Sequence, residues 1–171
     1  MKRIMIIGCC GAGKSTLARR LNAITNLPLY HLDQYYWKEN WTETPKEEWG
    51  PIVINLAKKE EWIIDGNYGG TFQPRMDRAD TIIYLKYSTL KCLSRVTMRV
   101  IKYHGKVRLD MPDGCRERFH FGFFHYVATF NMVRGKSILA RLNNCRENAN
   151  VVVLKSDKEV HAYLENLQIM F

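Results

Sequence analysis

The sequence predicts an α/β protein with a five-stranded parallel sheet and helices on both of its faces. Short apolar runs alternate with longer amphipathic segments along the chain, as in sheets whose parallel strands are joined by helices. The apolar runs are rich in β-branched or aromatic residues and lack in/out alternation, which is typical of strands buried on both faces. The five predicted strands cover residues 3–7, 29–32, 62–65, 81–86 and 151–154.

Two helices have ends that the sequence identifies. One begins with a capping box that has proline at the first helical position, formed by Thr44, Pro45 and Glu47. The other is capped by Ser88 and runs to about His104, where Gly105 is a stop signal. The least regular stretches, residues 66–80 and 105–122, are rich in Gly, Pro, Arg and Asp and are therefore candidates for functional loops.

The composition suits one globular domain that covers residues 1–171. Hydrophobic residues make up 46% of the chain, and its length is enough to bury a sizeable core. No stretch approaches the roughly 18 consecutive apolar residues of a membrane-spanning helix, and the first residues lack the pattern of a signal peptide. We therefore expect a cytoplasmic protein with no membrane partner. The sequence does not indicate an oligomeric state.

Cysteine spacing and net charge restrict the chemistry further. The cysteines are odd in number and lack C-x-x-C spacing or zinc-like partners, so we expect reduced thiols without metal at Cys9, Cys10, Cys92, Cys115 and Cys145. The chain has 26 Lys and Arg against 17 Asp and Glu, and its isoelectric point is near 9.4. This excess implies anionic partners, among which nucleic acid, nucleotide phosphates and acidic metabolites all fit.

A Walker A motif, or P-loop, follows the first predicted strand. Residues 8–15, Gly-Cys-Cys-Gly-Ala-Gly-Lys-Ser, match G-x-x-x-x-G-K-[ST] and lead directly into a helix that begins near Lys14. The backbone N–H groups and the helix N-terminus bind phosphates in such a loop, whereas Lys14 reaches the β- and γ-phosphates and Ser15 ligates Mg²⁺. The predicted nucleotide-binding residues are Gly8, Gly11, Ala12, Gly13, Lys14, Ser15 and Thr16. An ordinary Gly-rich turn is the alternative, but strand, spacing, Lys-Ser pair and helix all favour the P-loop.

Two aspartates end predicted strands near the P-loop, where carboxylates that support Mg²⁺ usually lie. Asp65 ends the run Trp-Ile-Ile-Asp and is placed like a Walker B acid that holds the metal or its waters. Asp33 follows the second strand, where it can accept a proton from an acceptor hydroxyl. The alternative for each is a cap on the following turn.

The whole chain resembles the adenylate-kinase-like branch of P-loop kinases, and more narrowly the bacterial DNA topology modulation proteins. Four segments carry the narrower resemblance: residues 8–16; Leu32-Asp33 followed by Trp37 and Trp41; residues 62–68; and residues 112–119. The resemblance implies a three-layer P-loop NTPase fold with a short lid, ATP and Mg²⁺ as cofactors, and kinase activity.

The chain departs from adenylate kinases after the third strand and in the lid. Asp65-Gly66-Asn67-Tyr68 matches only the first two residues of an Asp-Gly-Phe-Pro-Arg sequence, so AMP is in doubt as acceptor and Arg75 is a candidate for the arginine's role. Residues 105–122, called here the lid segment, are placed like the lid insertion. Cys115 is its only cysteine, so the resemblance implies a metal-free lid that closes through arginines. Arg116 and Arg118 are its candidate nucleotide-binding residues.

Basic residues share one face of the helix that Ser88 begins. They are Lys91, Arg95, Arg99 and Lys102, opposite Leu93, Val96, Val100 and Ile101. The resemblance implies that this helix presents arginines to the transferring phosphoryl group, so Arg95 and Arg99 join Lys14, Asp33 and Asp65 as predicted catalytic residues. Further candidates are Arg134 and Arg141. A solvated basic face is the alternative.

Three aromatic or polar segments have two interpretations each. The aromatic residues in 120–130 are expected to fill the core, with stacking on a substrate ring as the alternative. Trp37 and Trp41 line an acceptor pocket or only pack the loop after the second strand. Lys155-Ser156-Asp157 touches the nucleotide base or forms a helix start with Ser156 as cap.

The leading functional hypothesis is a kinase that uses MgATP and phosphorylates a small acceptor, which the sequence does not name. A nucleotide-switched DNA regulator is the second hypothesis, suggested by the family label and the charge. It is not favoured, because no helix-turn-helix, zinc-finger or ribbon signature occurs. A simple NTPase is the third. The sequence leaves ATP against GTP undecided.

Overall fold

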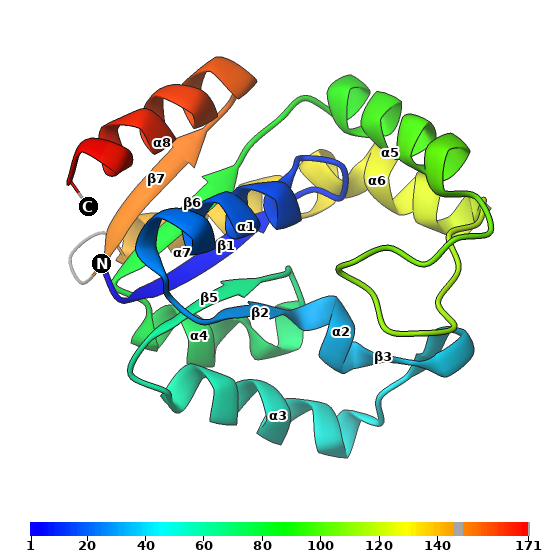
Figure 1. Cartoon of the computed structure of the whole chain (residues 1–171), viewed down its shortest axis with the longest axis horizontal. Coiled ribbons are helices and arrows are strands. Elements are labelled where there is room, and N and C mark those ends of the chain that lie inside the picture. Colours follow the sequence, from blue (N-terminus) through cyan, green and yellow to red (C-terminus); the bar gives the residue numbers. More distant parts are fainter. Residues whose placement is uncertain (146–148, 171) are drawn as a thin grey trace.

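A five-stranded parallel sheet forms the centre of the computed structural model, which describes residues 1–145 and 149–170. Its strands are β1 (Arg3–Gly8), β2 (Leu29–His31), β5 (Trp62–Asp65), β6 (Thr81–Leu85) and β7 (Asn150–Leu154). They lie in the order β2-β5-β1-β6-β7, and each neighbouring pair is parallel (Figure 1). All five predicted strands and the predicted α/β fold class are confirmed.

Helices connect these strands and cover both faces of the sheet. They are α1 (Lys14–Thr25), α3 (Lys46–Lys58), α4 (Phe72–Arg78), α5 (Thr89–Tyr103), α6 (Phe121–Val133), α7 (Gly135–Cys145) and α8 (Asp157–Met170). The crossover from β1 to β2 runs in the opposite direction to those from β2 to β5 and from β5 to β6. Right-handed crossovers therefore place α1 on one face and α3 and α4 on the other. The last helix, α8, packs against α1.

The core lies between these layers. Ile4, Met5, Ile6 and Ile7 of β1 are completely buried, as are Ile63 and Ile64 of β5. Because consecutive side chains on a strand point to opposite faces, complete burial of the whole run requires helices on both sides. This explains why the strands read as continuous apolar runs rather than alternating ones.

Short elements follow β2 at one end of the sheet. They are α2 (Leu32–Tyr36), β3 (Trp37–Lys38), the 3₁₀ turn η1 (Glu39–Trp41) and β4 (Thr42–Glu43). A second 3₁₀ turn, η2 (Gly69–Thr71), follows β5. Strands β3 and β4 form a small antiparallel hairpin. Asp33 thus lies in the first turn of α2 rather than at a strand end.

Two of the predicted helix starts are confirmed and one is wrong. Ser88 caps α5, because its Oγ accepts from the Lys91 N–H at 3.3 Å. Ser156 caps α8 by accepting from the Glu159 N–H at 3.2 Å. The capping box at Thr44 does not form, since the buried Thr44 hydroxyl instead donates to the carbonyl of Tyr35 at 3.0 Å. Helix α3 consequently begins at Lys46, with Pro45 as its N-cap.

Helix α5 ends at Tyr103, and Gly105 follows with a φ of +71°, as the sequence predicts. Its buried face contains Cys92, Val96 and Val100. Ile101, expected on that apolar face, is 67% exposed, because it follows the buried Val100 by one residue and so lies about 100° farther around the helix.

The lid segment runs between α5 and α6 and extends toward α2 and β3 (Figure 1). Two isolated bridges, His104 with Glu117 and Val107 with Arg116, pair its two arms. Its tip contacts the region after β2 through hydrogen bonds from the Gln34 side chain to the Leu109 carbonyl, at 2.9 Å, and from the Cys115 thiol to the Lys38 carbonyl, at 3.3 Å. The rest of the segment is irregular, as expected.

Across the described residues, no helix combines the length and the apolar character needed to cross a membrane.

Candidate active site

The phosphate cradle, residues 8–16, begins where β1 ends, and two of its glycines are required by close backbone contacts. A Cβ at Gly8 would lie 2.6 Å from the Leu85 carbonyl oxygen, and one at Gly11 would lie 2.5 Å from that of Cys92. Both have positive φ values, 149° and 82°, which disfavour other residues. Asn67 fastens the cradle to the loop after β5, because its amide accepts from the Gly8 N–H at 3.1 Å and donates to the Gly8 carbonyl at 2.8 Å.

Lys14 and Ser15 open α1 and face the cavity that the cradle forms, and Ala12, Gly13 and Thr16 also line it. The Lys14 Nζ donates to the Cys9 carbonyl at 3.2 Å, so the lysine folds back along the loop. Burial by itself lowers the pKa of Lys14, but the neighbouring Cys10, Asp65 and Asp33 side chains raise it above its usual value. The lysine is therefore charged at neutral pH, which suits contact with phosphates.

Asp65 ends β5 close to the cradle and is only 4% exposed. Its Oδ2 is 2.9 Å from the Nδ1 of His31, which ends the neighbouring strand β2. Its Oδ1 is buried and has no hydrogen-bond partner within residues 1–145 and 149–170. The alternative interpretation as a turn cap would require that oxygen to accept an N–H, and no such bond forms among those residues. An unpaired buried carboxylate oxygen costs free energy unless a cation or water reaches it.

These residues fit a magnesium ion. Hard cations such as Mg²⁺ prefer carboxylate and hydroxyl oxygens. Asp65 supplies a free carboxylate oxygen, and the Ser15 hydroxyl lies at the same cavity. A third oxygen donor lines the same cavity, since Asp110 of the lid segment also faces it.

Asp33 lines the same cavity as the cradle and accepts a hydrogen bond from Tyr68. The Tyr68 hydroxyl donates to its Oδ1 at 2.5 Å. Burial raises the pKa of Asp33 and outweighs the hydrogen bond from Tyr68 and the positive charges of Lys14 and Arg108, which lower it. A carboxylate with a raised pKa is a better proton acceptor near neutral pH than an ordinary aspartate.

A cluster of aromatic rings extends from Tyr68, the hydrogen-bond partner of Asp33. The Tyr68 ring packs against the rings of Tyr36 and Trp49, each with a centroid distance of 4.8 Å. The Trp37 ring packs against that of Tyr36, with centroids 5.0 Å apart, and against that of Trp41, with centroids 5.3 Å apart. Trp49 is buried, whereas Tyr36, Trp37 and Trp41 line the cavity. Trp37 and Trp41 therefore pack the loop after β2, as one interpretation predicts, and both also line the cavity.

Arg95 and Arg99 both face the cavity from α5, but they have different partners. Arg95 pairs with Asp157 at 2.5 Å, which Lys91 also approaches at 3.4 Å, and it reaches the Ala12 carbonyl at 3.4 Å. The hydrogen bond from Arg95 is the main reason that the pKa of Asp157 is lowered. Arg99 instead points toward the lid segment, where its Nη2 is 3.3 Å from Glu117.

Arg108, which the sequence interpretation did not select, is the lid arginine with the most contacts to charged groups. Its Nε is 2.7 Å from Glu117 and its Nη1 is 2.7 Å from Asp110. Of the two predicted lid arginines, Arg118 lines the cavity and Arg116 does not. The Arg116 side chain is exposed near Trp41, whose indole N–H donates to the Arg116 carbonyl at 3.0 Å.

Arg75 has a structural role rather than the role in phosphate chemistry that the sequence suggested. Its side chain is completely buried and donates to the carbonyls of Thr71, Gly66, Asn67 and Tyr68 at 2.6–3.1 Å. All of its donor nitrogens are used by the loop after β5. The loop that carries Asn67 and Tyr68 is therefore built around this arginine.

The remaining candidates divide between cavity and core. Arg134 lines the cavity, whereas Arg141 lies over the Phe72 ring at 5.9 Å. In α6, Val127 and Phe130 are buried in the core, but Phe123 and Tyr126 line the cavity together with His120. The expectation of a core role for this aromatic segment is thus correct only for its inner face. Asp157 also lines the cavity, so the 155–157 segment is both a helix start and part of the site.

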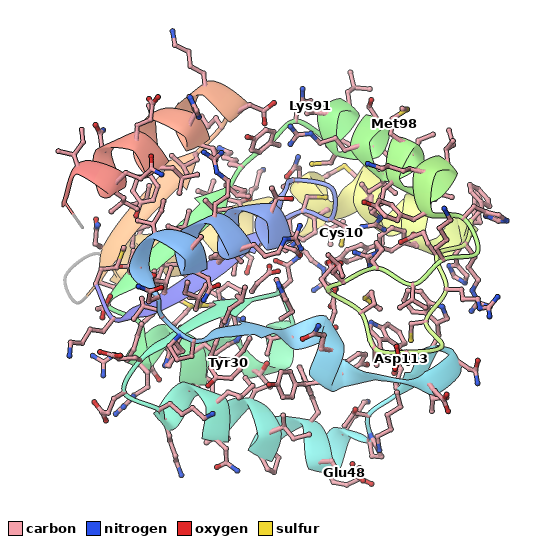
Figure 2. The ribbon with its side chains drawn as sticks, viewed as in Figure 1. Cys10, Tyr30, Glu48, Lys91, Met98 and Asp113 are labelled. Carbon is pink, nitrogen blue, oxygen red and sulfur yellow. The ribbon has the colours of Figure 1, made fainter. Side chains whose placement is uncertain are left out.

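A cavity of about 1430 Å³ connects these groups. Figure 2 shows the cradle residue Cys10 near the middle of the molecule, opposite the lid segment that carries Asp113. Of the residues that the sequence predicts for the site, Lys14, Ser15, Asp33, Asp65, Arg95 and Arg99 line this cavity. The sequence interpretation missed Arg108, Glu117 and the bonding of Asn67 and Tyr68, because these act through contacts between segments far apart in the chain.

The sheet order, the cradle and the lid segment define the fold of P-loop kinases, and solved structures agree. The shikimate kinase of Acinetobacter baumannii in complex with shikimate has a TM-score of 0.60 at 16% identity, covering 99% of this chain and 93% of that one. A sugar kinase from Janibacter sp. HTCC2649 gives 0.52 at 14%, covering 99% and 91%. The deoxyadenosine kinase of M. mycoides with bound dCTP gives 0.51 at 14%, covering 97% and 98%. No protein-family model matches the chain, and no curated protein matches it significantly.

Proposed function

We propose that the protein is an ATP-dependent kinase that transfers the γ-phosphoryl group to a hydroxyl of a small acceptor. The observation that carries this proposal is the cavity of about 1430 Å³, which the phosphate cradle and Asp33 both line. Pockets of about 300–1,000 Å³ enclose one drug-sized ligand, so this cavity has room for a nucleotide and an acceptor together.

The cradle is the donor side of the proposed reaction. Backbone N–H groups of residues 8–16 and the charged Lys14 would hold the phosphates, with the N-terminus of α1 adding a favourable dipole. Ser15 and Asp65 would hold a magnesium ion, which would supply positive charge to neutralise the phosphate oxygens when bound. Arg95 contacts the Ala12 carbonyl of the cradle, and its partner Asp157 is the first residue of α8.

Asp33 is the proposed base of the transfer step. Its carboxylate would accept the proton of the acceptor hydroxyl as the hydroxyl oxygen attacks the γ-phosphorus. The bond from that phosphorus to the β,γ-bridging oxygen then breaks, and ADP leaves with the bridging electrons. Arg99 would neutralise the charge that develops on the phosphoryl oxygens, and the lid segment would exclude water that otherwise hydrolyses ATP.

The acceptor side is bounded by Tyr36, Trp37 and Trp41 beside Asp33. These flat, largely apolar surfaces suit an acceptor with a ring, and Asp33 suits an acceptor with a free hydroxyl. The narrower kinship with DNA topology modulation proteins belongs to this proposal. Its support is that Asp33, Trp37 and Trp41, which carry the resemblance, all line the cavity. A cytoplasmic location is proposed with it.

Acceptor-dependent release of ADP tests this function. Nucleosides, nucleotides and hydroxylated metabolites would be screened one at a time with purified protein, ATP and Mg²⁺. Lys14→Ala is the inactive control, and Lys58→Ala, on an exposed face of α3, is the matched lysine control. ATP turnover that no acceptor increases would identify a simple NTPase instead. ATP-dependent DNA binding that persists at high salt would favour the regulator.

A further inference from the structure

Two arginines from different parts of the chain meet at one carboxylate, that of Glu117. Arg99 of α5 places its Nη2 3.3 Å from Oε1, and Arg108 of the lid segment places its Nε 2.7 Å from Oε2. All three side chains are largely buried, and the carboxylate is only 5% exposed. Such a triad is therefore weakly screened by solvent, and its geometry matters more than that of a surface ion pair.

The backbone fixes Glu117 at the base of the lid segment. Its N–H donates to the Lys106 carbonyl at 2.8 Å, and its carbonyl accepts from the Gly105 N–H at 2.9 Å. These bonds join the returning arm of the lid segment to the residues that directly follow α5 (Figure 1). The carboxylate is thus held relative to both Arg99, on that helix, and Arg108, on the outgoing arm.

Without a carboxylate between them, two buried guanidinium groups would repel one another and separate. Glu117 contacts each guanidinium through a single nitrogen, and both arginines still line the cavity that Lys14 and Asp33 share. A guanidinium has five donors, so the N–H groups of Arg99 that Glu117 does not use, and those of Arg108 that neither Glu117 nor Asp110 uses, remain for an anionic ligand. A γ-phosphate between the cradle and Asp33 would be that ligand.

We propose that Glu117 is a positioning residue that holds Arg99 and Arg108 as a pair facing the γ-phosphate of the bound nucleotide. This inference rests on the proposed kinase function. It distinguishes Glu117, which contacts both arginines, from Asp110, which pairs with Arg108 at 2.7 Å.

The test compares the affinity for a non-hydrolysable ATP analogue with that for ADP, because the difference isolates contacts to the γ-phosphate without any acceptor. Calorimetry with Mg²⁺ would measure both dissociation constants for the wild type, Glu117→Gln and Glu117→Asp. Asp113→Asn is the matched control, since Asp113 is an exposed carboxylate of the same lid segment (Figure 2). Thermal melting would verify that each variant is folded.

We expect Glu117→Gln to reduce the preference for the analogue over ADP about tenfold, the factor that corresponds to one charge-assisted hydrogen bond. Its affinity for ADP should stay within about twofold of the wild-type value. Glu117→Asp keeps the charge but is too short to reach both arginines, so its preference should be intermediate. Should Glu117→Gln not fold, Glu117→Asp decides the question. Asp113→Asn should behave as the wild type.

Three results overturn the inference. The first is a Glu117→Gln variant that prefers the analogue over ADP as strongly as the wild type does. The second is a Glu117→Gln variant that binds the analogue more tightly, which would make Glu117 a competitor of the phosphates, and the third is a wild type that binds the analogue and ADP equally well. These leave the proposed function standing as long as Lys14→Ala still weakens nucleotide binding. A wild type that binds neither nucleotide instead overturns the proposed function itself.

Discussion

The phosphate cradle and the lid segment both border the same cavity, but they are built in opposite ways. The cradle acts mainly through the backbone of consecutive residues between β1 and α1, with glycines where Leu85 and Cys92 approach. The lid segment has little regular structure and acts through side chains. Its Glu117 and Arg108 form an ion pair at 2.7 Å, and Glu117 also contacts Arg99 of α5 at 3.3 Å.

This difference explains which kinds of functional site can be predicted from a sequence. A site made of consecutive backbone groups has a fixed spacing, so the sequence pattern identifies it. A site made of side-chain pairs depends on which segments the fold brings together, and the spacing carries no such information. The cradle should therefore supply most of the nucleotide affinity, whereas α5 and the lid segment should act on the γ-phosphate and on the rate of transfer.

The largest effect is expected from the cradle. Lys14→Ala should weaken MgATP binding by about 10³-fold, since two charge-assisted hydrogen bonds of about 2 kcal/mol each are lost. The fold should persist, because the Lys14 side chain bonds only the Cys9 carbonyl within the described residues. Calorimetry measures the affinity, and circular dichroism the fold. Full ATP affinity in a folded Lys14→Ala variant would contradict the assignment of the cradle as the phosphate-binding site.

Asp33→Asn should reduce acceptor-dependent turnover by about 10³-fold while leaving ATP affinity unchanged, because a general base contributes about 10² to 10⁴. Its melting temperature should stay constant or rise. Burial raises the pKa of Asp33, so the folded state favours the protonated carboxyl. That stabilisation is present below the unfolded pKa and is lost as the pH rises through the folded pKa. A neutral amide avoids this loss. A large fall in melting temperature would instead indicate a structural aspartate.

The two arginines of α5 are expected to differ in their effect on turnover. Arg99→Ala should lower turnover by about 10²-fold, since Arg99 lines the cavity beside the lid segment and would neutralise charge on the transferring group. Arg95→Ala should have a smaller effect on turnover, because Arg95 is held by Asp157 and by the Ala12 carbonyl rather than by the lid segment. Steady-state kinetics of both variants decide between them. Equal losses would contradict the different roles that their partners indicate.

The smallest effect concerns pH. Tyr68→Phe removes the hydrogen bond that lowers the pKa of Asp33, so that pKa should rise further. Because the base must be deprotonated, activity falls as the pH falls through this pKa, and the acid limb of the pH–rate profile should move to higher pH. Tyr36→Phe, which lacks a bond to Asp33 in the described structure, is the matched aromatic control. Identical acid limbs in the wild type and Tyr68→Phe would exclude Asp33 as the titrating base.

Arg75 and Thr44 show why the remaining sequence predictions failed. Both were interpreted from local patterns, Arg75 as a distant phosphate ligand and Thr44 as a helix cap. In the folded chain, Arg75 satisfies the carbonyls of the loop after β5, and Thr44 donates to Tyr35. A buried polar group bonds whatever partner the packing brings to it, and the sequence pattern does not reveal that partner.

By itself, the sequence determined the elements whose signals are local. The five buried strands follow from continuous apolar runs, the starts of α5 and α8 from Ser88 and Ser156, and the cradle from its glycine spacing. Only the tertiary structure decided that Asn67 fastens the cradle, that Tyr68 donates to Asp33, and that Glu117 lies between Arg99 and Arg108. These contacts join residues that are distant in the chain, and their partners are selected by burial and charge after the sheet has brought the segments together.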